Sequence, residues 1–216
     1  ATVCNIGFDT KQIFQAIKDA VKVTPKEQPI VVAGYPPHLK EVVDLAVQEG
    51  FPLHDYNILG LVGGESMSER QRELISFQRD SAQQISRTGF SKCYSAYGAS
   101  DLDVTIGLES DYAVQLRQEL HRNPKLAREL LGDNEFIPMI FPYDPLNYHI
   151  ETDKDQNLLF TCVRGDRISP RVRYNLADRG KTMPLSDVQA IVKKHNVSLD
   201  SAPRTTLPLL FNIFLT

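Results

Sequence analysis

The sequence predicts an α/β fold in which a layer of parallel strands is followed by a smaller antiparallel β region. Short continuous apolar runs alternate with stretches of helical periodicity up to about residue 135. Beyond that point, short alternating runs are separated by prolines and Asp-rich turns, which is typical of hairpins. With 42% apolar and 24% charged residues, the composition is that of a globular chain. We therefore expect two subdomains, 1–135 and 136–216.

The first elements follow the pattern strand, helix, strand. Apolar residues at helical spacing after Asp9, a good N-cap residue, predict a helix over about 10–22. The apolar run 29–34 predicts a strand covered on both faces, and 56–62 predicts another. Between them, the spacing over 39–47 predicts a helix that Gly50 closes. A right-handed crossover then makes the two strands parallel.

The later elements change in character. We expect a helix from Ser68 to about Thr88, a strand over 93–97 and a long helix over 113–131. Four short runs then predict antiparallel strands, at 139–141, 148–151, 158–163 and 171–174.

Charge, apolar runs and cysteines narrow the class of protein. Lys and Arg number 24 against 27 Asp and Glu, and the sequence has no cluster of basic residues of the kind that binds nucleic-acid phosphates. The longest apolar stretch, 207–215, falls short of the roughly 20 residues that span a bilayer, and no secretory signal is visible. Three widely spaced cysteines fit neither a disulfide framework nor a zinc site. We expect a cytoplasmic protein without a membrane or nucleic-acid partner.

The first candidate motif is Gly63-Gly64-Glu65, between a predicted strand and a predicted helix. Open α/β sheets bind ligands beyond the carboxyl ends of their strands, and glycines there let a planar ligand lie against the backbone. The alternative is a tight turn in which Glu65 and Ser66 cap the next helix.

The second candidate motif is Tyr97-Gly98-Ala99-Ser100-Asp101. The Tyr97 ring can stack on a base, the Ser100 hydroxyl can donate to a phosphate, and the Asp101 carboxylate can hold Mg²⁺. The alternative is an ordinary turn in which Tyr97 is a core aromatic.

The third candidate is Asp178, at the end of the stretch 171–178. A carboxylate can accept hydrogen bonds from both hydroxyls of a ribose, as acidic residues do in dinucleotide sites. The alternative is a surface ion pair with a neighbouring arginine.

In this order, the three motifs resemble those of the adenylate-forming enzyme superfamily, most closely its phenylacetate-CoA ligase-like branch. That superfamily has a GGE-type turn, then a Tyr-Gly-x-Thr/Ser-Glu motif, then Tyr-Arg-Thr-Gly-Asp. Here Asp101 stands in place of Glu, Asn175 in place of Arg and Ala177 in place of Gly. The resemblance covers about residues 1–211, the later part of the family's large N-terminal domain.

The resemblance implies an ATP-dependent, AMP-forming acyl ligase. Such an enzyme activates a small-molecule carboxylate as an acyl-adenylate and then transfers the acyl group to CoA or another thiol. Gly63, Gly64, Glu65 and Tyr97 would border the adenine, and Gly98 would belong to the same nucleotide-binding site. Ser100 would contact phosphate, Asp101 would bind Mg²⁺, and Asp178 would anchor the ribose.

The family's Ser/Thr/Gly-rich phosphate-binding loop has no counterpart in these 216 residues, nor has the small C-terminal domain with the catalytic lysine. The resemblance therefore implies a fragment of a larger enzyme, whose remainder is a further partner, and assigns no catalytic residue here. Two alternatives stand beside it. One is a catalytically inactive nucleotide-binding or interaction module derived from that fold, and the other is an unrelated α/β domain whose motifs are turns.

Overall fold

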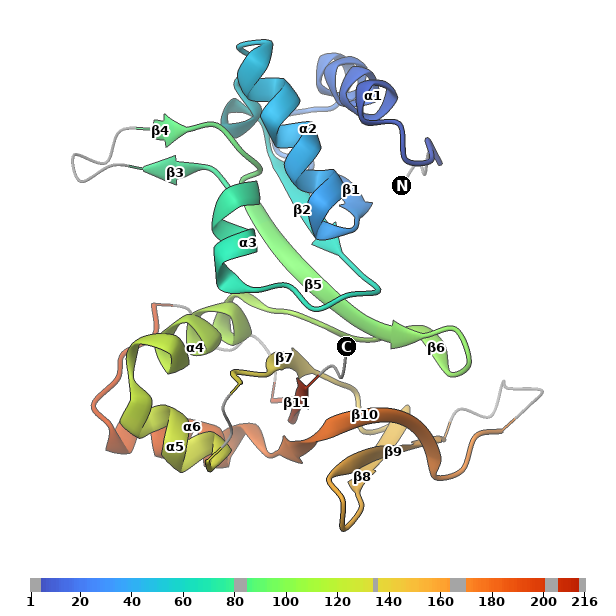
Figure 1. The fold of residues 1–216 in the computed structure, drawn as a ribbon, viewed down its shortest axis with the longest axis vertical. Helices are drawn as coiled ribbons and strands as arrows, with labels where there is room; N and C mark the ends of the chain where they lie inside the picture. The colour runs from blue at the N-terminus through green and yellow to red at the C-terminus, as the bar shows by residue number, and fades with distance from the viewer. Residues whose placement is uncertain (1–4, 80–84, 134–135, 164–169, 201–205, 214–216) are drawn as a thin grey trace. The chain divides into compact units, whose positions relative to one another are not determined.

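The computed structural model describes residues 5–79, 85–133, 136–163, 170–200 and 206–213. It divides the chain into two compact units, Ala1–Ser95 and Ala96–Thr216 (Figure 1). This division does not coincide with the expected boundary at 135, where the sequence changes from helical to alternating periodicity. The helices before residue 135 and the strands after it pack on a common core in the second unit.

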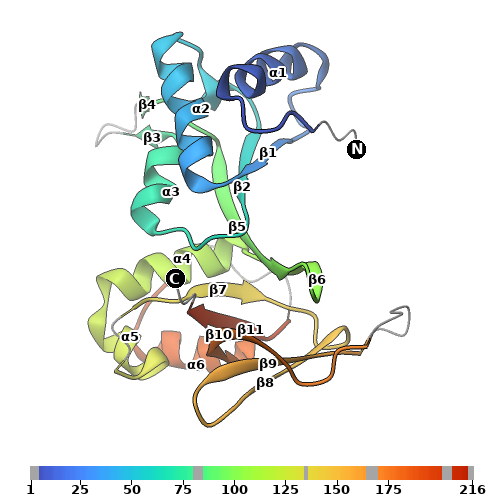
Figure 2. The same ribbon diagram turned by 45° about the vertical axis from the view of Figure 1, so that its right-hand side comes forward.

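The first unit is built on parallel strands. Strand β1 (Ile30–Gly34) pairs in parallel with β2 (Ile58–Val62), and β2 with the first half of β5 (Lys92–Ala99). Helices α1 (Thr10–Val23), α2 (Pro36–Gln48) and α3 (Glu69–Ile75) lie against these strands, with a 3₁₀ turn at Leu53–Asp55 (Figure 2). The predicted parallel α/β layer is therefore confirmed.

Local signals explain where these helices begin and end. The Asp9 side chain accepts hydrogen bonds from two backbone amides at the start of α1, as expected of an N-cap. The turn after α2 ends at Gly50, whose φ of 65° lies in the left-handed region that glycine adopts at no steric cost.

Strand β1 is less covered than expected. Its Val31 side chain is 54% exposed, whereas Val32 packs against the core. The expectation of a strand buried on both faces was wrong, because Val31 and Ala33 alternate onto a face of β1 that is exposed.

The expected long helix after Ser68 was also wrong. Helix α3 ends at Ile75, and a short hairpin follows, β3 (Gln78–Arg79) with β4 (Ile85–Arg87). The chain leaves the helix because Phe90 exchanges backbone hydrogen bonds with Ile75 and Phe77. Gly89, which precedes Phe90, allows the two segments to come this close, since a Cβ at position 89 would lie 2.4 Å from the carbonyl carbon of Ser76.

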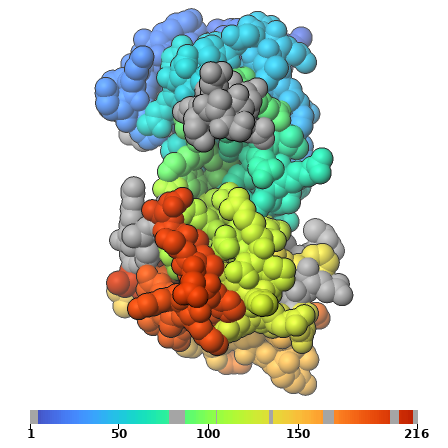
Figure 3. Space-filling view, turned by 90° about the vertical axis from the view of Figure 1, so that its left-hand side faces the viewer, coloured from blue at the N-terminus to red at the C-terminus, as the bar shows by residue number. Residues whose placement is uncertain are grey.

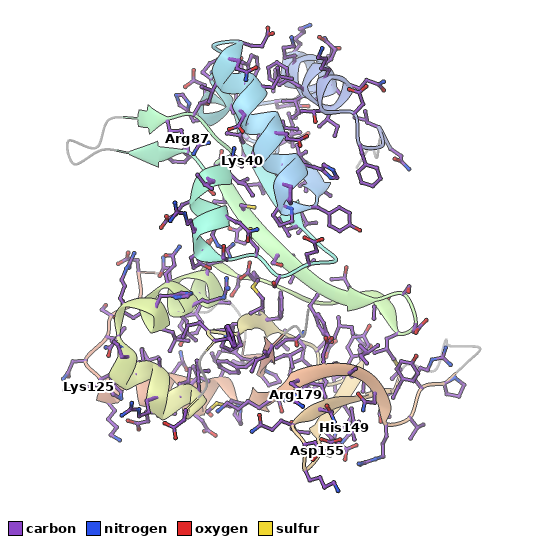
Figure 4. All side chains as sticks on the ribbon, viewed as in Figure 1. Lys40, Arg87, Lys125, His149, Asp155 and Arg179 are labelled. Carbon is purple, nitrogen blue, oxygen red and sulfur yellow. The ribbon has the colours of Figure 1, made fainter. Side chains whose placement is uncertain are left out.

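An ion-pair cluster ties this hairpin to α2. The Asp44 carboxylate on α2 pairs with Lys40 one turn earlier and, at 3.3 Å, with Nη2 of Arg87 on β4. Figure 4 shows the Lys40 and Arg87 side chains between these two elements.

The second unit is built on a five-stranded antiparallel sheet of order β7-β11-β10-β9-β8. Its strands are β7 (Met139–Pro142), β8 (Tyr148–Thr152), β9 (Asn157–Cys162), β10 (Tyr174–Met183) and β11 (Leu209–Ile213). The predicted antiparallel region is confirmed, and 209–213 adds a fifth strand that the sequence pattern did not predict.

Three helices cover one face of this sheet: α4 (Asp111–Arg122), α5 (Pro124–Leu131) and α6 (Leu185–Lys194). Figure 3 shows α6 in orange-red beside the yellow-green α4 and α5. The single helix expected over 113–131 is two helices, because Pro124 cannot continue a helix and Asn123 instead caps the start of α5.

The opposite face packs on the hairpin that the second half of β5 forms with β6 (Asp103–Leu108). This core contains Tyr97, Phe141, Phe160 and Leu210. None of the helices within the described residues has the length and apolarity needed to cross a membrane.

Candidate functional site

Two hydrogen bonds join the second and third sequence motifs within the second unit. The Tyr97 hydroxyl donates to Oδ2 of Asp178 over 2.6 Å, and the Tyr174 hydroxyl donates to Oδ2 of Asp101 over 2.8 Å. These partners are 81 and 73 positions apart in the chain. The fold thus brings together residues that the sequence analysis selected separately.

Tyr97 lies at the centre of the β5–β6 face of the core. Its ring is 2% exposed and stacks on Phe141 at 5.7 Å between centroids, with Phe160 at 6.1 Å. The ring is therefore a core aromatic, which was the alternative considered for it. The hydroxyl is the part of Tyr97 that reaches the site, through Asp178.

A bulge in β10 aims Asp178 at this hydroxyl. Between Asn175 and Arg179, β10 advances by four residues while the paired stretch of β9 advances by two, so β10 carries extra residues here. The Asn175 side chain accepts a hydrogen bond from the Ala177 amide at 2.7 Å, and Ala177 has a φ of 65°. A φ in this left-handed region is one that glycine adopts at no steric cost and alanine does not.

Asp178 is half-buried, and burial raises the pKa of its carboxyl above the ordinary value. The Tyr97 hydrogen bond and the nearby Asn212 amide act in the opposite direction and only partly offset burial. Burial also raises the pKa of Tyr97, and the Asp178 carboxylate reinforces this, so the phenol keeps its proton and remains the donor. Within the described part of the chain, Oδ1 of Asp178 has no hydrogen-bond partner.

Asn212 on β11 is a site residue that the sequence analysis missed. It is fully buried, and its amide atoms meet hydrogen-bond geometry with no described residue, although the amide lies close enough to Tyr97 and Asp178 to lower both pKa values. The sequence feature that could have identified Asn212 is that it is an amide side chain within the otherwise apolar run 207–215. Buried polar side chains without partners are costly, and this one is tolerated beside the carboxylate.

Gly98, Ser100 and Asp101 belong to the end of β5 and the turn that follows it. The strand is irregular at Gly98, and the Ser100 and Asp101 side chains are exposed. Arg171 donates from Nε to the Asp101 carbonyl over 3.1 Å, and its guanidinium lies 5.3 Å from the centre of the Tyr174 ring. These contacts fix the turn to the strand that carries Asp178.

The turn at Ser100 and Asp101 offers few ligands for a magnesium ion. No group of three or more His, Cys, Asp or Glu that could hold a metal occurs among the described residues. Asp101 offers one exposed carboxylate, of which one oxygen accepts from Tyr174. Mg²⁺ commonly takes one or two carboxylates together with substrate phosphates and water, and Asp101 fits only that kind of shell.

Gly63, Gly64 and Glu65 lie in the first unit, in the loop between β2 and α3. Gly64 has a φ of 81°, and a Cβ there would lie 2.9 Å from Cε1 of Tyr35. The loop therefore requires glycine at this position. The alternative in which Glu65 and Ser66 cap α3 was wrong, because Ser68 caps this helix in a capping box with Gln71. That these residues share a cleft with Tyr97 and Asp178 stays a prediction.

Comparison with known proteins finds similarity to solved structures but none to a family model or to a curated sequence. An open conformation of 2-hydroxyisobutyryl-CoA ligase, solved in complex with 2-HIB-AMP and CoA, aligns with a TM-score of 0.48 and 10% identity. The alignment covers 80% of this chain and 35% of that one, so the chain spans about a third of the ligase's length.

Proposed function

We propose that this chain is part of an ATP-dependent carboxylate-activating ligase and supplies the adenosine side of its nucleotide site. The observation that supports the proposal is the hydrogen bond between Tyr97 and Asp178, since it joins the Tyr-Gly-x-Ser-Asp motif to the proposed ribose carboxylate. Because a buried tyrosine hydroxyl usually takes a hydrogen-bond partner in any fold, the pairing supports the proposal together with the order of the three motifs and not by itself.

In the proposed reaction, a carboxylate oxygen of the substrate attacks the α-phosphorus of ATP. The bond to the β,γ-phosphates breaks, so that pyrophosphate leaves and an acyl-adenylate remains. The sulfur of CoA or of another thiol then attacks the acyl carbon, and AMP departs as the thiol loses its proton. Positioning and charge stabilisation are the protein's contribution to such steps.

Asp178 is the proposed anchor for the ribose. Tyr97 holds Oδ2, and Oδ1 stays available for the ligand's hydroxyls. A carboxylate fixed through one oxygen loses little conformational freedom when the other accepts a hydrogen bond, which favours binding. Tyr97 and Asn212 are positioning residues in this scheme because they contact Asp178 rather than the nucleotide.

The remaining residues have narrower proposed roles. Gly63, Gly64 and Glu65 would border the adenine, Gly98 would belong to the same nucleotide-binding site, and the exposed Ser100 hydroxyl would donate to a phosphate oxygen. Asp101 would hold Mg²⁺ together with the phosphates of ATP. When bound, that ion would neutralise charge on the departing pyrophosphate.

Calorimetric titration of AMP, adenosine and pyrophosphate tests the proposal. Asp178→Ala should weaken AMP binding by roughly 1–3 kcal/mol, because the ribose hydroxyls lose a charged acceptor. Ser100→Ala should have a smaller effect, and adenosine should bind better than pyrophosphate. Asp155→Ala, an exposed carboxylate in the β8–β9 turn (Figure 4), is the matched control and should leave AMP affinity unchanged.

Circular dichroism of each variant establishes that it is folded. Unchanged AMP affinity in a folded Asp178→Ala variant would overturn the site, and so would pyrophosphate binding as tight as adenosine binding. Assay of ATP–pyrophosphate exchange by the 216-residue chain is a separate measurement. We expect no exchange, since the chain has no counterpart of the family's phosphate loop and catalytic lysine, and removing one preorganised donor already costs on the order of a hundredfold in rate.

A further inference from the structure

The other face of the five-stranded sheet has a pocket at the C-terminal end of α5. It has a volume of about 210 Å³. Its lining is partly apolar and partly polar. The apolar residues are Leu131, Pro138, Phe211 and Ile213, the polar ones are Thr152, Gln156 and Lys181, and Gly180 also lines the pocket. Because side chains alternate along β10, Lys181 faces this pocket whereas Asp178 faces the opposite core with Tyr97.

Lys181 is the chemically distinctive residue of this pocket. Its ammonium donates to the Leu130 carbonyl at the end of α5 over 2.5 Å, and it is only partly exposed. Burial lowers the pKa of this lysine. No carboxylate within the described ranges lies at ion-pair distance from it, so its partner is a carbonyl at the C-terminal end of α5, which supplies partial rather than full negative charge.

A second cation stands beside it. Arg179 lies two positions earlier on the same side of β10. It is paired with Ile213 of β11, as Lys181 is paired with Phe211. Its side chain is exposed, and among the residues with a described position it has no ion-pair partner. Figure 4 marks Arg179 on this strand. Two cations over an apolar floor are complementary to a ligand with an anionic head and an apolar body.

We propose that this pocket binds a small carboxylate with an apolar body, such as an aromatic monocarboxylate. The Lys181 ammonium would donate to the carboxylate, Arg179 would lie at its outer side, and the apolar body would rest on Phe211 and Leu131. The volume corresponds to roughly seven water molecules at about 30 Å³ each, which suits a compact ligand. An inorganic phosphate lacks the apolar part and would keep its hydration shell.

Benzoate is the probe for this site, titrated into the full chain and followed by chemical-shift changes of the Phe211 and Ile213 resonances. Lys181→Met keeps the length of the side chain without its charge and should weaken benzoate binding at least tenfold. Lys181→Arg should retain most of the affinity. Lys125→Met makes the same chemical change at an exposed lysine in the first turn of α5 (Figure 4) and should bind as the wild type does.

Neutral benzamide and inorganic phosphate complete the test, and each should bind at least tenfold more weakly than benzoate. Equal binding of benzamide would overturn the role of the charge, and equal binding of phosphate would overturn the carboxylate class. If Lys181→Met does not fold, Arg179→Gln removes the second cation and should weaken benzoate binding, with Lys181→Arg as the charge-preserving comparison. The inference is independent of the proposed function, since Asp178→Ala should leave the Phe211 and Ile213 shifts on benzoate unchanged.

Discussion

Replacing Tyr97 by Phe isolates the hydrogen bond on which the proposed site depends. The change removes one oxygen atom and leaves the ring stacked on Phe141 and beside Phe160, so the loss of packing is small. Asp178, half-buried, is then left without its 2.6 Å donor. A hydrogen bond to a charged group contributes about 1.5–3 kcal/mol net, and we expect the free energy of unfolding of the second unit to fall by about 2 kcal/mol.

Urea denaturation at pH 7 measures this change. For a urea dependence of about 2 kcal/mol per molar, the expected loss moves the unfolding midpoint down by roughly 1 M. Tyr174→Phe is the matched control, because it removes the same atom from a tyrosine–aspartate hydrogen bond that is exposed to solvent, although the Tyr174 side chain itself is partly buried. Its midpoint should stay within experimental error of the wild type.

Two results would refute the reasoning. An unchanged midpoint for Tyr97→Phe would mean that the hydrogen bond adds nothing to stability, and an equal shift for Tyr174→Phe would mean that burial does not matter. A double-mutant cycle between Tyr97→Phe and Asp178→Asn then measures the coupling of the two side chains directly.

The other predictions concern the backbone and the carboxylate. Ala177→Gly should raise the free energy of unfolding by about 0.5–1 kcal/mol in urea titrations, because alanine at a φ of 65° is strained and glycine is not. Since burial raises the pKa of Asp178, the wild type should lose stability as pH rises from about 4 through that raised pKa, and Asp178→Asn should remove this part of the loss in urea midpoints measured from pH 3.5 to 7. Gly180→Ala should cost about 3 kcal/mol or more by the same assay, because its Cβ would lie 2.0 Å from the Phe211 carbonyl oxygen. Gly63→Ala has open space around the new Cβ and should leave the fold intact, so a loss of AMP affinity in that variant would support an adenine at this loop and unchanged affinity would contradict it.

Local signals in the sequence predicted the elements that depend on neighbouring residues. Asp9 marks the start of α1, Gly50 the end of α2, and the apolar runs became strands β1 and β2. The errors occurred where distant contacts decide the structure. Helix α3 ends because Phe90 bonds to Ile75 and Phe77, and no pattern within 68–88 reveals that partner.

In the candidate site, too, local sequence features were predictable and contacts between distant residues were not. Residue types and the order of the motifs along the chain selected Tyr97, Asp101 and Asp178, although Asp178 lies within β10 and not past the end of a strand as expected. The pairing of Tyr97 with Asp178 depends on the order of the strands and on the bulge at Ala177, which shifts β10 against β9. Sequence periodicity could not predict that shift, because a bulge changes the face on which every later residue lies.

The position of β11 in its sheet has a consequence for how the chain folds during synthesis. Strand β7 ends at Pro142, yet its partner β11 begins at Leu209, and β11 also separates β7 from β10. The first unit has all its strands once residue 95 has left the ribosome, whereas the sheet of the second unit stays open until residues 209–213 emerge. At 5–20 residues per second, we expect β7 to wait several seconds without its partner, exposed to chaperones and to pairing with other chains.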